Sequence, residues 1–234
     1  MNICTEKIKN KEYNGAISSE LVKVSQEYRV LAVLRYLFPG EYDQMEHGDK
    51  PDLQDTINHI GIEVTAAVQG DDMKANRALA EIDKHSSNSQ RKAQKKIIES
   101  GYDINIFNGI PSISKTGTAD SEKSCLLNAI INKCKKADKY KGNFAKIGLA
   151  VVLPEIPTSD AEKNIDDWIK EIHSEIESSF DLIYVISHRF CIVYDIKNEY
   201  MDKKCLKKTD YCLLCKIARM TAEGDLTLNN SEWK

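Results

Sequence analysis

The stretch KPDLQDTINHIGIEVTAAV, residues 50–68, predicts a β-hairpin with one carboxylate in each arm. Two extended runs flank a polar middle, and a turn centred on Ile57 and Asn58 places Asp52 directly opposite Glu63. The Cβ atoms of such a pair lie about 5 Å apart on one face of the sheet. Two like charges at that distance repel each other, so a purely structural sheet would avoid this pairing.

The apolar residues of the hairpin fit the same register. Leu53, Ile62 and Val64 would point to the opposite, packed face, and the β-branched residues are typical of a core strand. A hard cation such as Mg²⁺ between the acids would offset their repulsion, because it takes carboxylate oxygens and keeps other positions for water and phosphate. The alternative is an edge hairpin with two surface acids and a chance Pro-Asp dipeptide.

The rest of the chain alternates between helical and strand patterns. Residues 18–37 place apolar side chains at three- and four-residue steps, which predicts an amphipathic helix that ends at Pro39 and Gly40. The other expected elements are a strand at 41–47, hairpin strands at 51–56 and 60–66, a polar helix or helix pair at 71–100 broken near 85–90, strand and loop at 102–117, a helix at 120–138, a strand at 147–153, a helix at 160–179, two strands within 180–196 and a helix at 209–224. This order predicts an α/β fold with a mixed central β-sheet flanked by helices.

The length of the chain suits a single domain over residues 1–234. We expect a core at about 18–155 with a helical insertion at about 71–100, followed by a C-terminal extension of sheet and helices at 156–234. No run approaches the ~18 apolar residues of a membrane span. The N-terminus lacks the apolar stretch of a secretion signal, so we expect a cytoplasmic protein with no membrane partner.

The charge is unevenly distributed although the net charge is only −3. Residues 91–141 carry 11 Lys and Arg against 5 Asp and Glu, whereas residues 1–90 carry 10 against 15 and residues 142–234 carry 12 against 16. The basic segment is either a set of solvated helix faces or a patch that faces a polyanion such as nucleic acid.

The chain has seven cysteines, an odd number that argues against disulfides in a reducing compartment. Cys212 and Cys215, with Cys205 and Cys191 upstream, could form a zinc or iron–sulfur site. The alternative is that they are small buried hydrophobic residues within a helix and a strand.

Pro51-Asp52, a gap of ten residues and Glu63-Val64-Thr65 together resemble the motif of the PD-(D/E)xK, or restriction-endonuclease-like, nuclease superfamily. The resemblance implies a core of helix, three antiparallel strands, helix and strand (α-β-β-β-α-β). It also implies that Asp52 and Glu63 bind Mg²⁺ or Mn²⁺, with the Val64 carbonyl completing the coordination. The family's third motif residue is a lysine that orients or activates the attacking water.

Position 65 departs from the family pattern, because Thr65 stands where the lysine is expected. A hydroxyl supplies no fixed positive charge and is a poor base at neutral pH. Related nucleases draw this lysine from the helix that follows the third strand, where Lys133, Lys136 and Tyr140 share one helix face by spacing. Lys133 and Lys136 are therefore the candidate catalytic lysines, the alternative being that both are solvated, and Tyr140 and Thr65 are accessory candidates.

The family's opening helix often carries an acid near the metal. Glu27 or Glu20 could fill that role here, and the alternative is that these glutamates face solvent. The leading hypothesis is a Mg²⁺-dependent nuclease that acts on DNA rather than RNA, with a homodimer left open. The second is a nuclease-like module that no longer cuts but binds nucleic acid or a protein partner, and the third is an unrelated α/β protein in which the acid pair is a coincidence.

Overall fold

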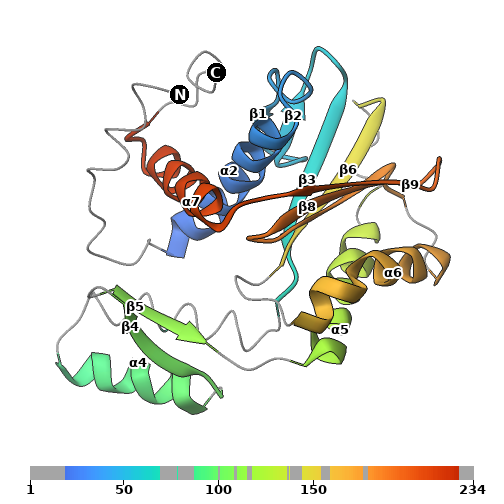
Figure 1. Ribbon diagram of the computed structural model, residues 1–234. Helices are drawn as coiled ribbons and strands as arrows, with labels where there is room; N and C mark the ends of the chain where they lie inside the picture. The colour runs from blue at the N-terminus through green and yellow to red at the C-terminus, as the bar shows by residue number, and fades with distance from the viewer. Residues whose placement is uncertain are drawn as a thin grey trace.

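The protein is described from a computed structural model, which describes residues 19–68, 78, 87–99, 101–107, 110–114, 118–135, 137, 144–153, 159–175 and 179–226 (Figure 1). Its helices are α2 (Ser19–Leu37), α4 (Ser87–Glu99), α5 (Ala119–Cys134), α6 (Ser159–Glu175) and α7 (Lys208–Ala222). Its strands are β1 (Glu46–His47), β2 (Leu53–Asp55), β3 (Ile60–Ala66), β4 (Asp103–Phe107), β5 (Ile110–Ser114), β6 (Lys146–Val152), β7 (Leu182–Ile186), β8 (Phe190–Asp195) and β9 (Tyr200–Cys205).

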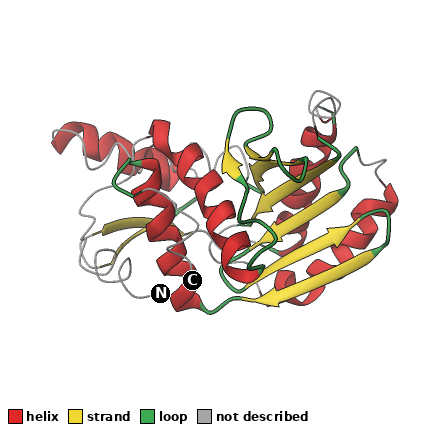
Figure 2. Cartoon of the chain, turned by 90° about the horizontal axis from the view of Figure 1, so that it is seen from above, coloured by secondary structure: helices red, strands yellow, loops and turns green. Residues whose placement is uncertain are grey.

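The centre of the fold is a seven-stranded mixed sheet in the order β1-β2-β3-β6-β7-β8-β9. Strands β3, β6 and β7 run parallel, and every other neighbouring pair in this sheet is antiparallel. Helices lie on both faces of the sheet (Figures 1 and 2). The expected α/β fold with a mixed, helix-flanked sheet is therefore confirmed.

The hairpin of residues 50–68 has the expected register. Leu53 pairs with Ile62, and Asp55 pairs with Ile60. The turn between them is held by Asp55, whose Oδ1 accepts hydrogen bonds from the backbone N–H groups of Ile57 and Asn58 at 3.0 and 2.8 Å. The alternation of side chains along β3 then decides which residues face each helical layer.

Two hydrophobic cores lie on the two faces of the sheet. On one face α2 and α7 pack over Leu53, Ile62 and Val64, all of which are buried. On the other face α5 and α6 pack over a second set of sheet residues, which includes Leu149 and Val151 on β6. Glu63 pairs in parallel register with Leu149, so it belongs to the α5 face of β3.

Of the helical insertion expected at 71–100, the structure describes Ala78 and residues 87–99, and the rest lies outside the described residues. Helix α4 begins at Ser87, inside the stretch where a break was expected, and the hairpin of β4 and β5 follows it. Ala93 and Ile97 of α4 form a small separate core with Ala78. The sequence pattern indicated a helix and, at 102–117, a strand, but it did not indicate that β4 and β5 pair as a second sheet.

Three further elements differ from expectation. The strand expected at 41–47 is only Glu46–His47, because the Arg35 guanidinium binds the carbonyls of Tyr42, Asp43 and Met45 and holds the preceding residues in turns. The helix expected at 120–138 ends at Cys134. Strand β9 extends the sheet beyond the two strands expected within 180–196. None of the described helices is both long enough and apolar enough to cross a membrane.

Candidate functional site

Asp52 immediately precedes β2 and is 5% exposed. Its Oδ2 accepts a hydrogen bond from the backbone N–H of Val64 at 2.8 Å, which ties the carboxylate to β3. Its Oδ1 accepts a hydrogen bond from the Lys23 ammonium, on α2, at 2.9 Å. The carboxylate is thus fixed from two directions, by a neighbouring strand and by a helix.

Glu63 is the second acid of the hairpin and is also 5% exposed. It lies on the face of β3 that is covered by α5. The Lys133 ammonium, from the last turn of α5, donates a hydrogen bond to its Oε1 at 2.5 Å. An ammonium from α5 therefore lies beside Glu63, on the face of β3 that also carries Thr65.

Glu27, on α2, is a further buried acid beside Asp52, at 3% exposure. Its Oε2 lies 2.6 Å from the His47 Nε2, and its Oε1 forms an ion pair of 2.9 Å with the Lys23 ammonium. The His47 ring stacks on Tyr28, with centroids 4.8 Å apart. The alternative that Glu27 faces solvent is therefore wrong, and Glu27 and Asp52 share a single ammonium group.

Burial and mutual repulsion act on these acids. Burial raises the pKa of Asp52, and the negative charges of Glu63 and Glu27 raise it further, against the opposing effects of the Val64 N–H and Lys23. Burial also acts to raise the pKa of Glu27, but hydrogen bonding to His47 and pairing with Lys23 outweigh it, so that this pKa is lowered. Burial acts to lower the pKa of Lys23, yet its pairing with Glu27 and Asp52 raises it above the ordinary value. Burial and the neighbouring acids thus act against the charge of Asp52, while His47 and Lys23 stabilise the charge of Glu27.

Within the ranges that the structure describes, no three or more His, Cys, Asp or Glu side chains converge closely enough to hold a metal ion. The donor atoms nevertheless suit a hard cation, since they are carboxylate oxygens. Glu27 Oε1 is buried and faces the Lys23 ammonium at 2.9 Å. The cation now between Glu27 and Asp52 is the Lys23 ammonium. Carboxylate oxygens are also ligands of Mg²⁺ and Mn²⁺, and such an ion would have to replace that ammonium.

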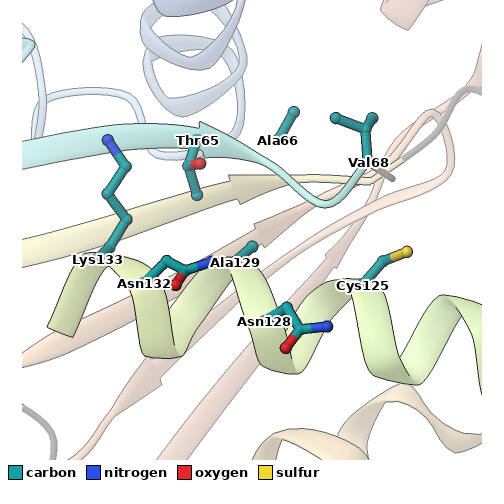
Figure 3. A pocket seen from close by; sticks show the side chains of 8 residues that line it. All are labelled: Thr65, Ala66, Val68, Cys125, Asn128, Ala129, Asn132 and Lys133. Carbon is teal, nitrogen blue, oxygen red and sulfur yellow. The ribbon is translucent and has the colours of Figure 1, made fainter. Parts of the chain in front are cut away.

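A pocket of about 160 Å³ lies between the end of β3 and α5, with Lys133 in its wall. It is lined by Thr65, Ala66, Val68, Cys125, Asn128, Ala129, Asn132 and Lys133. Figure 3 shows Thr65 pointing from β3 toward α5 and the Lys133 side chain reaching from α5 to the strand. A cavity of about 150 Å³ is large enough for a benzene-sized group. The pocket could therefore receive one ring of a ligand beside Lys133.

The remaining expected site residues are only partly covered. Lys136 and Tyr140 lie outside the described residues, as does the side chain of Glu20. Cys191 is buried in β8, while Cys205 and Cys212 are exposed. In the described part of the chain these cysteines belong to no metal-binding group.

Lys23 and His47 are the site residues that the sequence analysis missed. Lys23 is four residues before Glu27 on α2, a spacing that pairs opposite charges on a helix, so the signal was present. His47 contacts Glu27 because β1 lies beside α2, and no local sequence pattern predicts that contact. Comparisons of the chain with protein-family models, with curated proteins and with solved structures gave no match.

Proposed function

We propose that this protein is a divalent-metal-dependent nuclease of the PD-(D/E)xK type, which hydrolyses phosphodiester bonds in DNA rather than RNA. The observation that carries the proposal is that Asp52 and Glu63 are both buried, that Asp52 is bonded to the backbone N–H of Val64, and that the Lys133 ammonium pairs with Glu63. Asp52 lies just before β2 and Glu63 lies on the neighbouring strand β3, and the ammonium reaches Glu63 from α5, the helix before β6. If α4, β4 and β5 are taken as an insertion between β3 and α5, the remaining order α2, β1, β2, β3, α5 and β6 agrees with the order that the family resemblance implies.

Asp52, Glu63 and the Val64 carbonyl would hold the metal, with Glu27 beside them. Such a metal polarises a phosphoryl oxygen and makes its bound water a better nucleophile. Lys133 would orient the attacking water next to Glu63, which is the role of the lysine that Thr65 replaces. The raised pKa of Asp52 supports a cation-binding role, because a second positive charge there would relieve the repulsion from Glu63 and Glu27.

The basic segment supports nucleic acid as the substrate. Helix α4 buries Ala93 and Ile97 against its own small core and exposes four basic side chains. These are Arg91, Lys92, Lys95 and Lys96. A cluster of exposed cations on one helix neutralises phosphates without reading sequence.

The direct test measures cleavage by the purified full-length chain with Mg²⁺ or Mn²⁺ on plasmid, linear duplex, single-stranded DNA and RNA. We expect metal-dependent cleavage of DNA that chelation abolishes. The variant Lys133→Met should lower the rate by about 100-fold or more, as loss of a positioned acid–base group does. Lys123→Met is the matched control, since Lys123 is on the same helix but pairs with Glu171. Equal activity in wild type and Lys133→Met would contradict the role of Lys133.

A nuclease-like module that binds without cutting is the second candidate function. It is favoured by Thr65 at the lysine position and by the two lysines that already neutralise the acids. This candidate predicts nucleic-acid binding that needs no divalent metal and is unchanged in Asp52→Asn. The absence of cleavage with every metal and substrate, together with such binding, would favour it over the nuclease.

A further inference from the structure

One ammonium group sits at the point that a cation between Glu27 and Asp52 would occupy. The Lys23 Nζ lies 2.9 Å from Glu27 Oε1 and 2.9 Å from Asp52 Oδ1. Both acids are almost fully buried, whereas the Lys23 side chain is 68% exposed. The positive charge that pairs with the two buried carboxylates therefore belongs to a side chain that lies largely in solvent.

The two lysines of the site are held differently. The Lys133 side chain is 20% exposed and contacts only one of the three acids, Glu63. Lys23 bridges two acids and remains largely in solvent, so its long stem can rotate away without leaving an apolar group unburied. Lys23 can therefore leave its position at small cost, provided that another cation takes over the two carboxylates.

We propose that Lys23 is a built-in competitor of the divalent cation, which must displace the Lys23 ammonium from Glu27 and Asp52 in order to bind. This inference deepens the proposed function and rests on it for the identity of the competing cation. It makes Lys23 a residue that sets the cation affinity and selectivity of the site. A divalent ion of higher charge density can replace the ammonium, whereas a monovalent ion offers the carboxylates no gain in charge over the lysine they already hold.

The first experiment measures Mn²⁺ binding by calorimetry on the full chain. Lys23→Gln should bind Mn²⁺ about tenfold or more tightly than wild type, a difference of about 1.4 kcal/mol. Lys23→Arg should behave like wild type, because its guanidinium can bridge the same acids. Lys95→Gln is the control, since Lys95 is similarly exposed but pairs only with Glu99, on α4. Equal or weaker binding by Lys23→Gln, in a wild type that does bind Mn²⁺, overturns the proposal and leaves the nuclease intact.

A second readout needs neither metal nor activity. Amine-directed labelling followed by mass spectrometry should modify Lys23 more slowly than Lys95 in wild type, although the two side chains are 68% and 76% exposed. The difference should disappear in Asp52→Asn, and Mn²⁺ should accelerate labelling of Lys23 in wild type. If Lys23 is labelled as fast as Lys95 without metal, it does not hold the acids and the proposal fails. A third outcome is that Lys23 is labelled slowly, that Mn²⁺ does not change this rate, and that neither wild type nor Lys23→Gln binds Mn²⁺. Lys23 would then neutralise the acids without competing with a divalent ion. That outcome overturns both this proposal and the nuclease.

Discussion

Asp52 and Asp55 are three residues apart in one hairpin, yet their carboxylates have different hydrogen-bond partners and different electrostatic surroundings. Asp55 is fully buried and accepts three hydrogen bonds from the turn, two from backbone N–H groups and one from the Asn58 side chain. Asp52 accepts one backbone N–H and one ammonium and is repelled by two neighbouring acids. Asp55 is thus a structural acid, and Asp52 carries an electrostatic strain that a structural role does not need.

This difference predicts opposite outcomes for two matched variants. Asp55→Asn should lower the free energy of unfolding by about 1–3 kcal/mol, because an amide cannot accept all three hydrogen bonds. Asp52→Asn should change it by less than about 1 kcal/mol at neutral pH, since the amide oxygen can still accept the Val64 N–H while the repulsion is removed. Chemical denaturation measures both values. A loss of about 3 kcal/mol or more in Asp52→Asn would mark a buried structural ion pair instead.

Thr65 offers a second test at the scale of single residues. Its side chain shares a face of β3 with Glu63 and lines the same pocket as Lys133. If an ammonium at this place is what the chemistry needs, then Thr65→Lys should restore cleavage to Lys133→Met. We expect the double variant to recover at least about tenfold in rate over Lys133→Met, a gain of about 1.4 kcal/mol in transition-state binding. No recovery, in a double variant that is folded and still binds Mn²⁺, would mean that the lysine must come from α5.

At the scale of elements, the sequence predicts those helices and strands whose form depends on a local residue pattern. The hairpin register follows from alternation and a polar turn, and both features belong to one short segment. Strand β9 was missed because its residues are mostly polar and partly exposed, as at the edge of a sheet. The burial of Glu27 was missed because α2 is buried on several sides, with Val30 to Leu34 all in the core, so periodicity marks no single solvent face.

The long-range contacts of the site could not be predicted from local sequence patterns. Lys23 meets Asp52 across 29 residues, and Lys133 meets Glu63 across 70. The family resemblance directed attention to α5 for a lysine, but spacing alone left Lys133 and Lys136 equivalent. The pairing of Lys133 with Glu63 depends on how α5 crosses β3, and that crossing is set by packing of the whole α5 face.

Helix α4 gives a prediction at the element scale. Replacing Arg91, Lys92, Lys95 and Lys96 by Gln removes four exposed positive charges and leaves the buried Ala93 and Ile97 in place. If this helix lies on DNA, the slope of log affinity against log salt should fall by up to about 3–4 units. Fluorescence anisotropy with a labelled duplex measures the slope.

The control for α4 removes the same amount of charge elsewhere. Lys163 and Lys170 on α6, with Lys207 and Lys208 at the start of α7, are also exposed. Their replacement by Gln should change the slope by less than about one unit, since none of them belongs to the basic segment. Equal effects of the two sets would show that binding follows net charge alone, and α4 would lose its assigned role.

At the scale of the whole molecule, the acids join layers that are otherwise separate. Glu27 belongs to the helical layer on one face of the sheet, Asp52 and Glu63 belong to the sheet, and Lys133 comes from the layer on the other face. A cation held by these acids would link α2 to the hairpin. Metal binding should therefore be visible as global stability and not only as catalysis.

Saturation with Mn²⁺ should raise the melting temperature of the wild type. At a free concentration of about 100 times the dissociation constant, binding stabilises the folded state by about 2.7 kcal/mol. For a chain of this size that corresponds to a rise of roughly 5–11 °C, at about 2–4 °C per kcal/mol. Asp52→Asn should show almost no rise, while Asp55→Asn should melt at a lower temperature but gain as much from Mn²⁺ as wild type.

The Mn²⁺-dependent rise in melting temperature should depend on pH through Asp52. Burial and the neighbouring acids raise the pKa of Asp52 above the ordinary 3.8. Without metal, the raised pKa means that the folded state binds a proton more readily than the unfolded chain, so stability from Asp52 is present at low pH and lost as pH rises through the folded pKa. Mn²⁺ needs the ionised carboxylate and acts in the opposite sense. The Mn²⁺-dependent rise should be full at pH 7.5 and should vanish on acidification while an ordinary aspartate is still ionised. Differential scanning calorimetry between pH 7.5 and 4 tests this, and a rise that persists undiminished at the acid end would mean that the cation is held by groups other than Asp52.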